Sequence, residues 1–78
     1  MTRLCNIKEN TVCTVTSVDA APAMLERLGE LGLINGTKVK CLFRAPSGDP
    51  TAYLIRGASI ALRRDCAHGI SVEQSELP

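Results

Sequence analysis

The chain has 78 residues with a formal net charge of +1, and 45% of its residues are apolar. This length predicts a single domain over residues 1–78, with a core at about 4–73 and a frayed tail at 74–78, and the apolar fraction argues against disorder. One Phe, one Tyr and the lack of any basic run argue against a nucleic-acid partner, because such binders usually carry a basic stripe and stacking aromatics.

No stretch approaches the roughly 20 apolar residues that span a bilayer, and no charged-then-apolar leader is present. We therefore expect a cytoplasmic protein that does not itself span a membrane. The four cysteines include no Cys-x-x-Cys pair, which is the main signal of zinc ribbons and thioredoxin-like sites. Scattered cysteines in a reducing compartment are most often buried thiols that act as small hydrophobic residues. We expect this of Cys5, Cys13, Cys41 and Cys66.

The N-terminal part of the chain predicts a packed edge segment and then a strand. Leu4 and Ile7 are expected to tuck under the edge of the domain. Residues 11–18 form the richest β-branched run of the chain and predict the first strand, with Cys13 and Val15 facing the core. Because the period of two is imperfect, we expect a bend or bulge in this strand.

A short helix is predicted over about Pro22–Leu31. Proline suits the first turn of a helix, Asp19 is a plausible cap, and Gly32 suits the left-handed position that ends a helix. Gly29 inside the helix costs roughly 0.8–1 kcal/mol relative to alanine, which suggests a close approach of another backbone or an irregular last turn. The apolar face of this helix consists of Met24, Leu25, Leu28 and Leu31, at positions i, i+1, i+4 and i+7.

The second strand is predicted over Thr37–Ala45, with the alternating residues Val39, Cys41 and Phe43 on one face. The segment Pro46–Pro50 is the strongest loop signal in the chain. Within it the sequence Ser47-Gly48-Asp49 lacks the frame of a phosphate-binding loop, so we expect Asp49 to cap the turn and Gly48 to take a positive φ.

Three further strands and one turn complete the predicted domain. Strands are predicted over residues 51–55, 59–63 and 69–73, and a single 3₁₀ turn over residues 64–67. Five short strands with a helix inserted after the first predict a mainly β fold, a small and partly open barrel. A flat sheet is disfavoured, because a domain this small cannot otherwise cover its exposed strand edges.

Several short motifs follow one another in a characteristic order and spacing over roughly residues 4–73. They are Arg27-Leu28, Leu31-Gly32-Leu33, Gly36, Val39, Ala45-Pro46-x-Gly48-Asp49-Pro50, Gly57, Ile60-Ala61-Leu62-Arg63, Ala67 and Ile70-x-Val72. Together they resemble the FeoA family, the small cytosolic accessory proteins of bacterial ferrous-iron transport. The resemblance implies a five-stranded SH3-like barrel with a helical insertion. It also implies a FeoB-type ferrous-iron permease, a membrane protein with a cytosolic G-domain, as the partner. The cysteines are not part of this pattern, and Glu9-Asn10 stands where members often have Pro-Gly.

The sequence gives little indication of an enzyme, because its single histidine, His68, has no evident partner that would activate it for catalysis. We therefore expect no catalytic residues, no bound cofactor and no dedicated metal site. The candidate ligands for a weakly bound ferrous or zinc ion are Asp65, Cys66 and His68, which offer a carboxylate, a thiolate and an imidazole. The simpler interpretation, which we favour, is a buried Cys66 beside a solvent-facing turn that carries His68.

A partner surface is expected to be aliphatic, because proline-peptide grooves are lined by more aromatics than this chain contains. Each candidate falls in a turn or opposite the expected core face, and arginines form the rim. The candidates are Leu33, Leu42 and Leu54, with Arg44, Arg56 and Arg63 around them.

Three functions follow from these observations. The first is a non-enzymatic accessory protein that docks on the cytosolic part of a FeoB-type permease, is recruited by it to the membrane, and modulates its activity. The second is a sensor or carrier of ferrous or another transition-metal ion. The third is a freestanding form of the SH3-like domain that iron- and manganese-dependent repressors carry at their C-termini. Self-association stays open, as does the sign of any effect on the permease.

Overall fold

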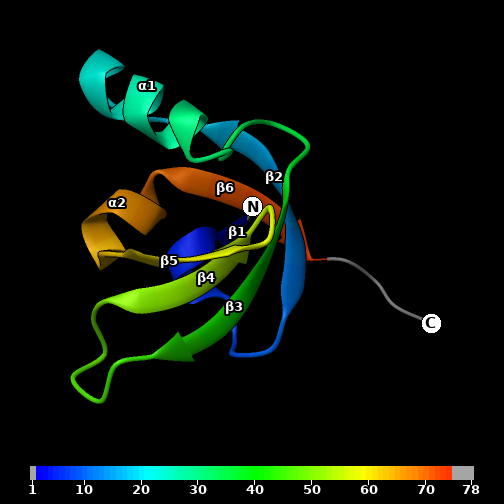
Figure 1. Cartoon of the computed structure of the whole chain (residues 1–78), viewed down its shortest axis with the longest axis vertical. Helices are drawn as coiled ribbons and strands as arrows, with labels where there is room; N and C mark the ends of the chain where they lie inside the picture. Colours follow the sequence, from blue (N-terminus) through cyan, green and yellow to red (C-terminus); the bar gives the residue numbers. More distant parts are fainter. Residues whose placement is uncertain (1, 75–78) are drawn as a thin grey trace.

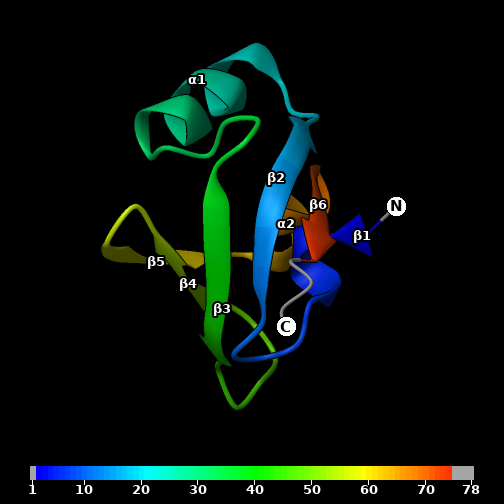
Figure 2. The same ribbon diagram turned by 90° about the vertical axis from the view of Figure 1, so that its right-hand side faces the viewer.

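The computed structural model describes residues 2–74, whose framework is one antiparallel sheet of six strands in the order β1-β6-β2-β3-β4-β5 (Figures 1 and 2). Helix α1 is inserted between β2 and β3, so the predicted mainly β fold with a helical insertion is confirmed. The sheet has one strand more than predicted, because the two residues of β1 pair with β6 and are too few to show a period. The strands are β1 (Thr2–Arg3), β2 (Val12–Val18), β3 (Lys38–Arg44), β4 (Thr51–Ile55), β5 (Ala58–Leu62) and β6 (Ile70–Gln74), and the helical segments are η1 (Leu4–Asn6), α1 (Pro22–Glu30) and α2 (Arg64–His68).

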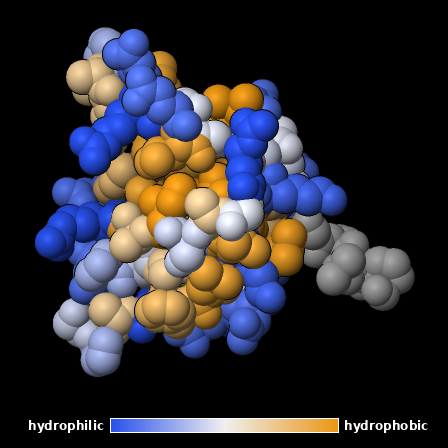
Figure 3. All heavy atoms as spheres, in the orientation of Figure 1, coloured by the Kyte–Doolittle hydropathy of each residue, from blue (hydrophilic) through white to orange (hydrophobic). Residues whose placement is uncertain are grey.

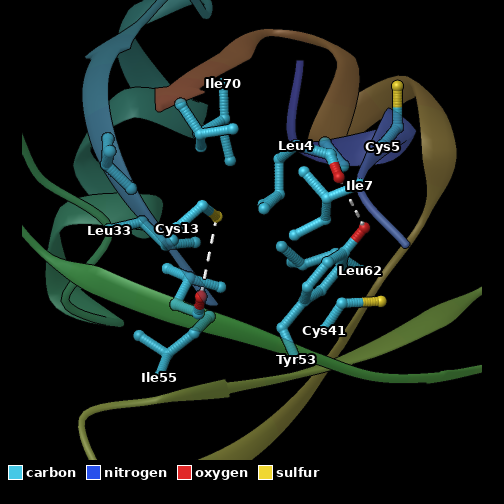
Figure 4. Packing of buried hydrophobic residues seen from close by; sticks show 14 of the residues in the cluster. Leu4, Cys5, Ile7, Cys13, Leu33, Cys41, Tyr53, Ile55, Leu62 and Ile70 are labelled. Carbon is cyan, nitrogen blue, oxygen red and sulfur yellow. Dashed lines mark hydrogen bonds between the residues drawn. The ribbon is translucent and has the colours of Figure 1, made fainter. Parts of the chain in front are cut away.

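The core forms where the inner face of the sheet meets η1. Leu4 and Ile7 are 0% and 2% exposed and point toward Tyr53 of β4 (Figure 4), which confirms their expected place under the edge. The Tyr53 hydroxyl donates a hydrogen bond of 3.4 Å to the Leu4 carbonyl oxygen, so this buried polar group is satisfied. The core cluster consists of Leu4, Cys5, Ile7, Cys13, Val15, Leu28, Leu33, Val39, Cys41, Tyr53, Ile55, Leu62, Ala67, Ile70 and Val72.

Two irregularities in strand register decide which side chains face the core. Between β2 and β6 the register shifts between Val15 and Ser17, which confirms the predicted bulge. Between β3 and β4 it shifts between Cys41 and Phe43, and such a shift turns the following residue to the other face. Phe43 is therefore 59% exposed, so its expected place on the core face is wrong.

The bulge in β3 also brings Arg44 against the N-terminal segment. Its guanidinium Nη2 donates to the carbonyl oxygens of Cys5 and Ile7, at 2.9 and 2.8 Å. Its backbone N–H donates to the carboxylate of Glu9 at 2.8 Å. These charge-assisted bonds attach η1 to the sheet.

Helix α1 ends as the sequence predicts. Gly32 has a φ of +96°, the Gly32 N–H donates to the Gly29 carbonyl oxygen, and the Leu33 N–H donates to the Leu28 carbonyl oxygen. This is the Schellman arrangement, in which the residue after the glycine packs against the last turn. Leu28 and Leu33 are accordingly both 1% exposed.

The other predictions for α1 are less accurate. The N-cap is Ala21, whose side chain cannot accept a hydrogen bond, so the cap predicted at Asp19 is wrong. A Cβ at Gly29 would meet open space within 4 Å of the described residues, so the expected close approach is wrong too. On the predicted apolar face Leu28 is buried, whereas Met24 and Leu25 are 40% and 44% exposed.

The C-terminal half follows the predicted element order closely. Strand β4 covers the predicted residues 51–55, and Gly48 has the expected positive φ of 93°. Residues 64–68 form the short α-helix α2 rather than a 3₁₀ turn. Asp49 does not cap its own turn: its Oδ1 accepts a 2.8 Å hydrogen bond from the Arg64 N–H at the start of α2. No helix among the described residues is long and apolar enough to cross a membrane.

Candidate functional site

A groove of about 590 Å³, here called the α1–α2 groove, lies between helix α1, strand β5 and helix α2. Figure 3 has the orientation of Figure 1 and shows apolar residues gathered over the middle of this face, bordered by hydrophilic ones. The apolar lining residues are Ala20, Ala21, Met24, Leu31, Ile60, Ala61, Leu62 and Cys66, and the charged ones are Asp19, Arg27, Arg63 and Asp65.

The groove exists because α1 is anchored at its two ends. Before the helix, the Asp19 N–H donates to the Gly69 carbonyl oxygen at 2.7 Å. The backbones are so close there that a Cβ at Gly69 would collide with the Asp19 carbonyl oxygen. At the end of the helix, Leu28 of the last turn and Leu33 just beyond it enter the core, and a Cβ at Gly32 would collide with the side chain of Arg56. The middle of α1 thus stands off the sheet.

A pair of sulfur atoms lies where α1 faces α2. The Cys66 Sγ is 3.9 Å from the Met24 Sδ, within the range of a weak thiol–thioether hydrogen bond. Burial raises the pKa of the Cys66 thiol, the nearby Asp65 carboxylate raises it further, and Arg27 opposes both. The thiol is therefore protonated at neutral pH and contributes polarizable apolar surface to the groove rather than a nucleophile.

A second groove, of about 560 Å³, is lined by Asp49, Arg63, Arg64, Asp65 and His68. Its character is polar, and it lies beside the same short helix α2. The Asp49 Oδ1 accepts the hydrogen bond from the Arg64 N–H of α2, and the Asp49 Oδ2 is 3.8 Å from the Arg63 guanidinium. Since the Arg63 side chain is 75% exposed, this ion pair contributes little to stability.

The three candidate metal ligands all fall on α2 but point into different surroundings. Cys66 lines the α1–α2 groove, His68 lines the second groove, and Asp65 lies beside both. Within residues 2–74, no three side chains of His, Cys, Asp or Glu are grouped as a metal ion would need. A weak ferrous or zinc site at these residues stays a prediction.

The candidate partner-binding residues divide into two groups. Leu33 was expected at the surface, and this expectation is wrong, because the Schellman arrangement turns its side chain into the core. Arg44 is half-buried and engaged with the N-terminal segment, so it is not a free rim residue. Leu54, Arg56 and Arg63 are exposed and Leu42 is half-buried. Of these candidates, Arg63 lines the α1–α2 groove.

The sequence interpretation missed Met24, Ile60 and Cys66 as surface residues of one groove. Met24 was placed on the apolar face of the predicted helix, Cys66 was expected to be buried, and Ile60 was named only within a predicted strand. No local signal could have found them, because an apolar residue has the same pattern in the sequence whether its own domain or a partner covers it.

The fold and the groove together define the class of domain to which the chain belongs. The chain is a small, mainly β domain of the SH3-like kind with a helical insertion that leaves an apolar groove open. The family model for the FeoA domain matches residues 2–74, and the chain belongs to the FeoA family.

Solved structures of related proteins agree with this assignment. The FeoA protein from Chlorobium tepidum is 41% identical with a TM-score of 0.89, and the match covers 94% of this chain and 70% of that one. A FeoA-like protein from Clostridium acetobutylicum is 27% identical with a TM-score of 0.86, covering 100% and 94%. The Stenotrophomonas maltophilia FeoA, solved with zinc and described as an SH3 domain protein possibly acting as a ferrous iron transport activating factor, is 28% identical with a TM-score of 0.81, covering 94% and 91%.

Repressor structures share the fold. A manganese-dependent transcriptional repressor is 22% identical with a TM-score of 0.86, and the match covers 95% of this chain but 36% of the repressor. At this identity the likeness shows the fold alone. No curated protein sequence matches the chain.

Proposed function

We propose that this protein is a non-enzymatic accessory protein of ferrous-iron uptake that docks on the cytosolic part of a FeoB-type permease and modulates its activity. Membership of the FeoA family supports the iron-transport role. The observation that carries the docking role is the α1–α2 groove, whose apolar lining is open to solvent although it adjoins the core.

The groove has the composition of a protein-binding surface. Its floor is aliphatic, and the flexible side chain of Met24 stands 40% exposed at its wall, a residue type that adapts to different partner shapes. The rim carries two cations, Arg27 and Arg63, and two carboxylates, Asp19 and Asp65. An apolar centre with a polar rim is the usual anatomy of a specific interface.

The chemistry of the cysteines supports a non-enzymatic role. Burial, reinforced by the neighbouring Cys41, raises the pKa of the Cys13 thiol to about 11, and burial also raises the pKa of Cys41. Protonated, buried thiols do not act as nucleophiles. A protein of this kind acts on a permease by binding one of its conformations more tightly than another.

The test is capture of the permease from detergent-solubilised membranes by the immobilised protein, in the GTP-bound, GDP-bound and nucleotide-free states. We expect a membrane protein with a G-domain to be retained. Met24→Ser should weaken its retention, because this side chain lines the groove. Leu25→Ser is the matched control, since Leu25 is equally exposed on α1 but lies outside the groove lining. The proposal is abandoned if no nucleotide state retains the permease.

A further inference from the structure

Strand β5 is the outermost strand of the sheet, and one of its edges borders the α1–α2 groove. It pairs with β4 through five consecutive residue pairs, and within residues 2–74 no strand pairs with its other edge. Exposed edges are normally blunted by a lysine, a proline or a bulge. The sequence Ala-Ser-Ile-Ala-Leu of β5 contains neither residue type, and its register with β4 is unbroken.

The hairpin geometry identifies the backbone groups on that free edge. The two-residue turn Arg56-Gly57, with φ of 51° and 84°, makes Ile55 and Ala58 the pair that exchanges two hydrogen bonds. Bonded and non-bonded pairs alternate along an antiparallel ladder, so Ser59 and Ala61 direct their N–H and C=O groups away from β4. Ala61 also lines the groove, so this edge of β5 borders the place where a ligand would lie.

We propose that this edge of β5 accepts one extended segment of the partner as an added strand. The segment forms main-chain hydrogen bonds with Ser59 and Ala61 and places aliphatic side chains in the α1–α2 groove. The inference rests on the proposed function, because it assigns the segment to the cytosolic part of the permease. The rim charges balance as two cations against two acids, which suits a segment that is uncharged where it crosses the groove.

A single segment fits this site better than a second copy of the chain. Helix α1 stands above the strands in Figure 2, and α1 and β5 line the same groove. Two copies that paired through β5 would each bring an α1 to the shared edge. One extended chain needs only about 4.8 Å beside β5, the ordinary spacing between strands.

The test uses proline to block the edge without breaking the fold. Ala61→Pro removes an N–H that points away from β4, so the ladder with β4 stays intact and the protein should fold. Ala61→Ser is the matched control, because it changes the side chain and keeps the N–H. In the capture of the permease from solubilised membranes, we expect Ala61→Pro to bind about tenfold more weakly than Ala61→Ser, because only the proline variant loses the main-chain bond and blocks the edge sterically.

Amide hydrogen exchange provides a second measurement that does not depend on a variant. In the free protein the amides of Ser59 and Ala61 should exchange faster than those of Ile60 and Leu62, and in the complex all four should be protected. Permease capture that Ala61→Pro leaves unchanged, with no new protection at Ser59 and Ala61, overturns the added strand and leaves the proposed function standing. Failure of the wild type to retain the permease overturns both. Protection that instead grows with the concentration of the protein alone shows a second copy at the edge and overturns the assignment to the permease.

Discussion

The close approach of the Asp19 and Gly69 backbones gives the sharpest test of how the groove is built. Gly69 has a φ of −79° and a ψ of −3°, a conformation that alanine adopts freely, so Gly69→Ala adds no backbone strain. Its new Cβ would collide with the Asp19 carbonyl oxygen, which is backbone and cannot rotate away. The two segments must therefore separate at the point where the Asp19 N–H bonds to the Gly69 carbonyl oxygen.

The expected cost combines two effects. Overpacking of this kind costs about 1–3 kcal/mol, and a weakened backbone hydrogen bond adds about 1 kcal/mol. Some of this is offset, because replacing glycine by alanine lowers the entropy of the unfolded chain by about 0.4–1 kcal/mol. We expect a net loss of about 1–3.5 kcal/mol, and for a domain of this size each kcal/mol lowers the melting temperature by about 4–8 °C.

Gly29→Ala is the matched control, because the same chemical change falls where a Cβ meets open space in the described chain. It should stabilise the protein by about 0.8–1 kcal/mol, the difference in helix propensity between glycine and alanine. Thermal unfolding followed by circular dichroism measures both variants, and the contribution of the unfolded chain largely cancels in their difference. If Gly69→Ala melts at or above the wild-type temperature, the backbone contact that anchors α1 is not the one described here.

Two further predictions concern ionisation and metal binding. The folded pKa of Cys13, about 11, lies above the ordinary thiol value of 9.0, so its contribution to the free energy of unfolding, on the order of 2–3 kcal/mol, is complete below pH 9 and is lost between about pH 9 and 11. Urea titrations from pH 7 to 11 should show this decline, and Cys13→Ala should make it shallower; part of it should remain, because burial also raises the pKa values of Cys41, Cys66 and Tyr53. An undiminished decline in Cys13→Ala would contradict the assignment to Cys13. Because Cys66 and His68 line different grooves, we expect anaerobic titration with ferrous ion to show no stoichiometric uptake, and one equivalent bound by wild type but lost in His68→Ala would restore the metal site.

Local sequence chemistry predicted the elements well. The end of α1 at Gly32 and the core positions Cys13 and Val15 follow from backbone conformation and from periodicity, which act over a few residues. The bulge at Cys41/Phe43 could not be placed in the same way, because Cys41, Leu42 and Phe43 are three apolar residues in a row and the pattern does not decide between Leu42 and Phe43 for the core face. That bulge decides the place of both Phe43 and Arg44, so one hidden register shift accounts for two wrong expectations.

The candidate site was harder to predict than the fold. An apolar stripe on a helix has the same pattern whether its own domain or a partner covers it, so Met24 and Leu25 could not be told from Leu28. The surface position predicted for Leu33 was wrong for the opposite reason, since the residue just after the helix-ending glycine enters the core here through the Schellman contact. Pairing between distant segments, such as α2 with the Pro46–Pro50 loop through Asp49, leaves no local signal.

The short length of α1 indicates how this helix would respond to a bound partner. The helix has nine residues, shorter than the about 12–15 residues at which isolated helices become marginal in water. It therefore depends on its two anchors, the Asp19–Gly69 contact before it and the Leu28–Leu33 pair at its C-terminal end. A segment bound in the groove would add contacts along the part between them, and such a ligand stabilises the element that it covers. Binding and the ordering of α1 are then coupled, so a variant that loosens an anchor, such as Gly69→Ala, should weaken partner binding even though Gly69 lies outside the groove lining.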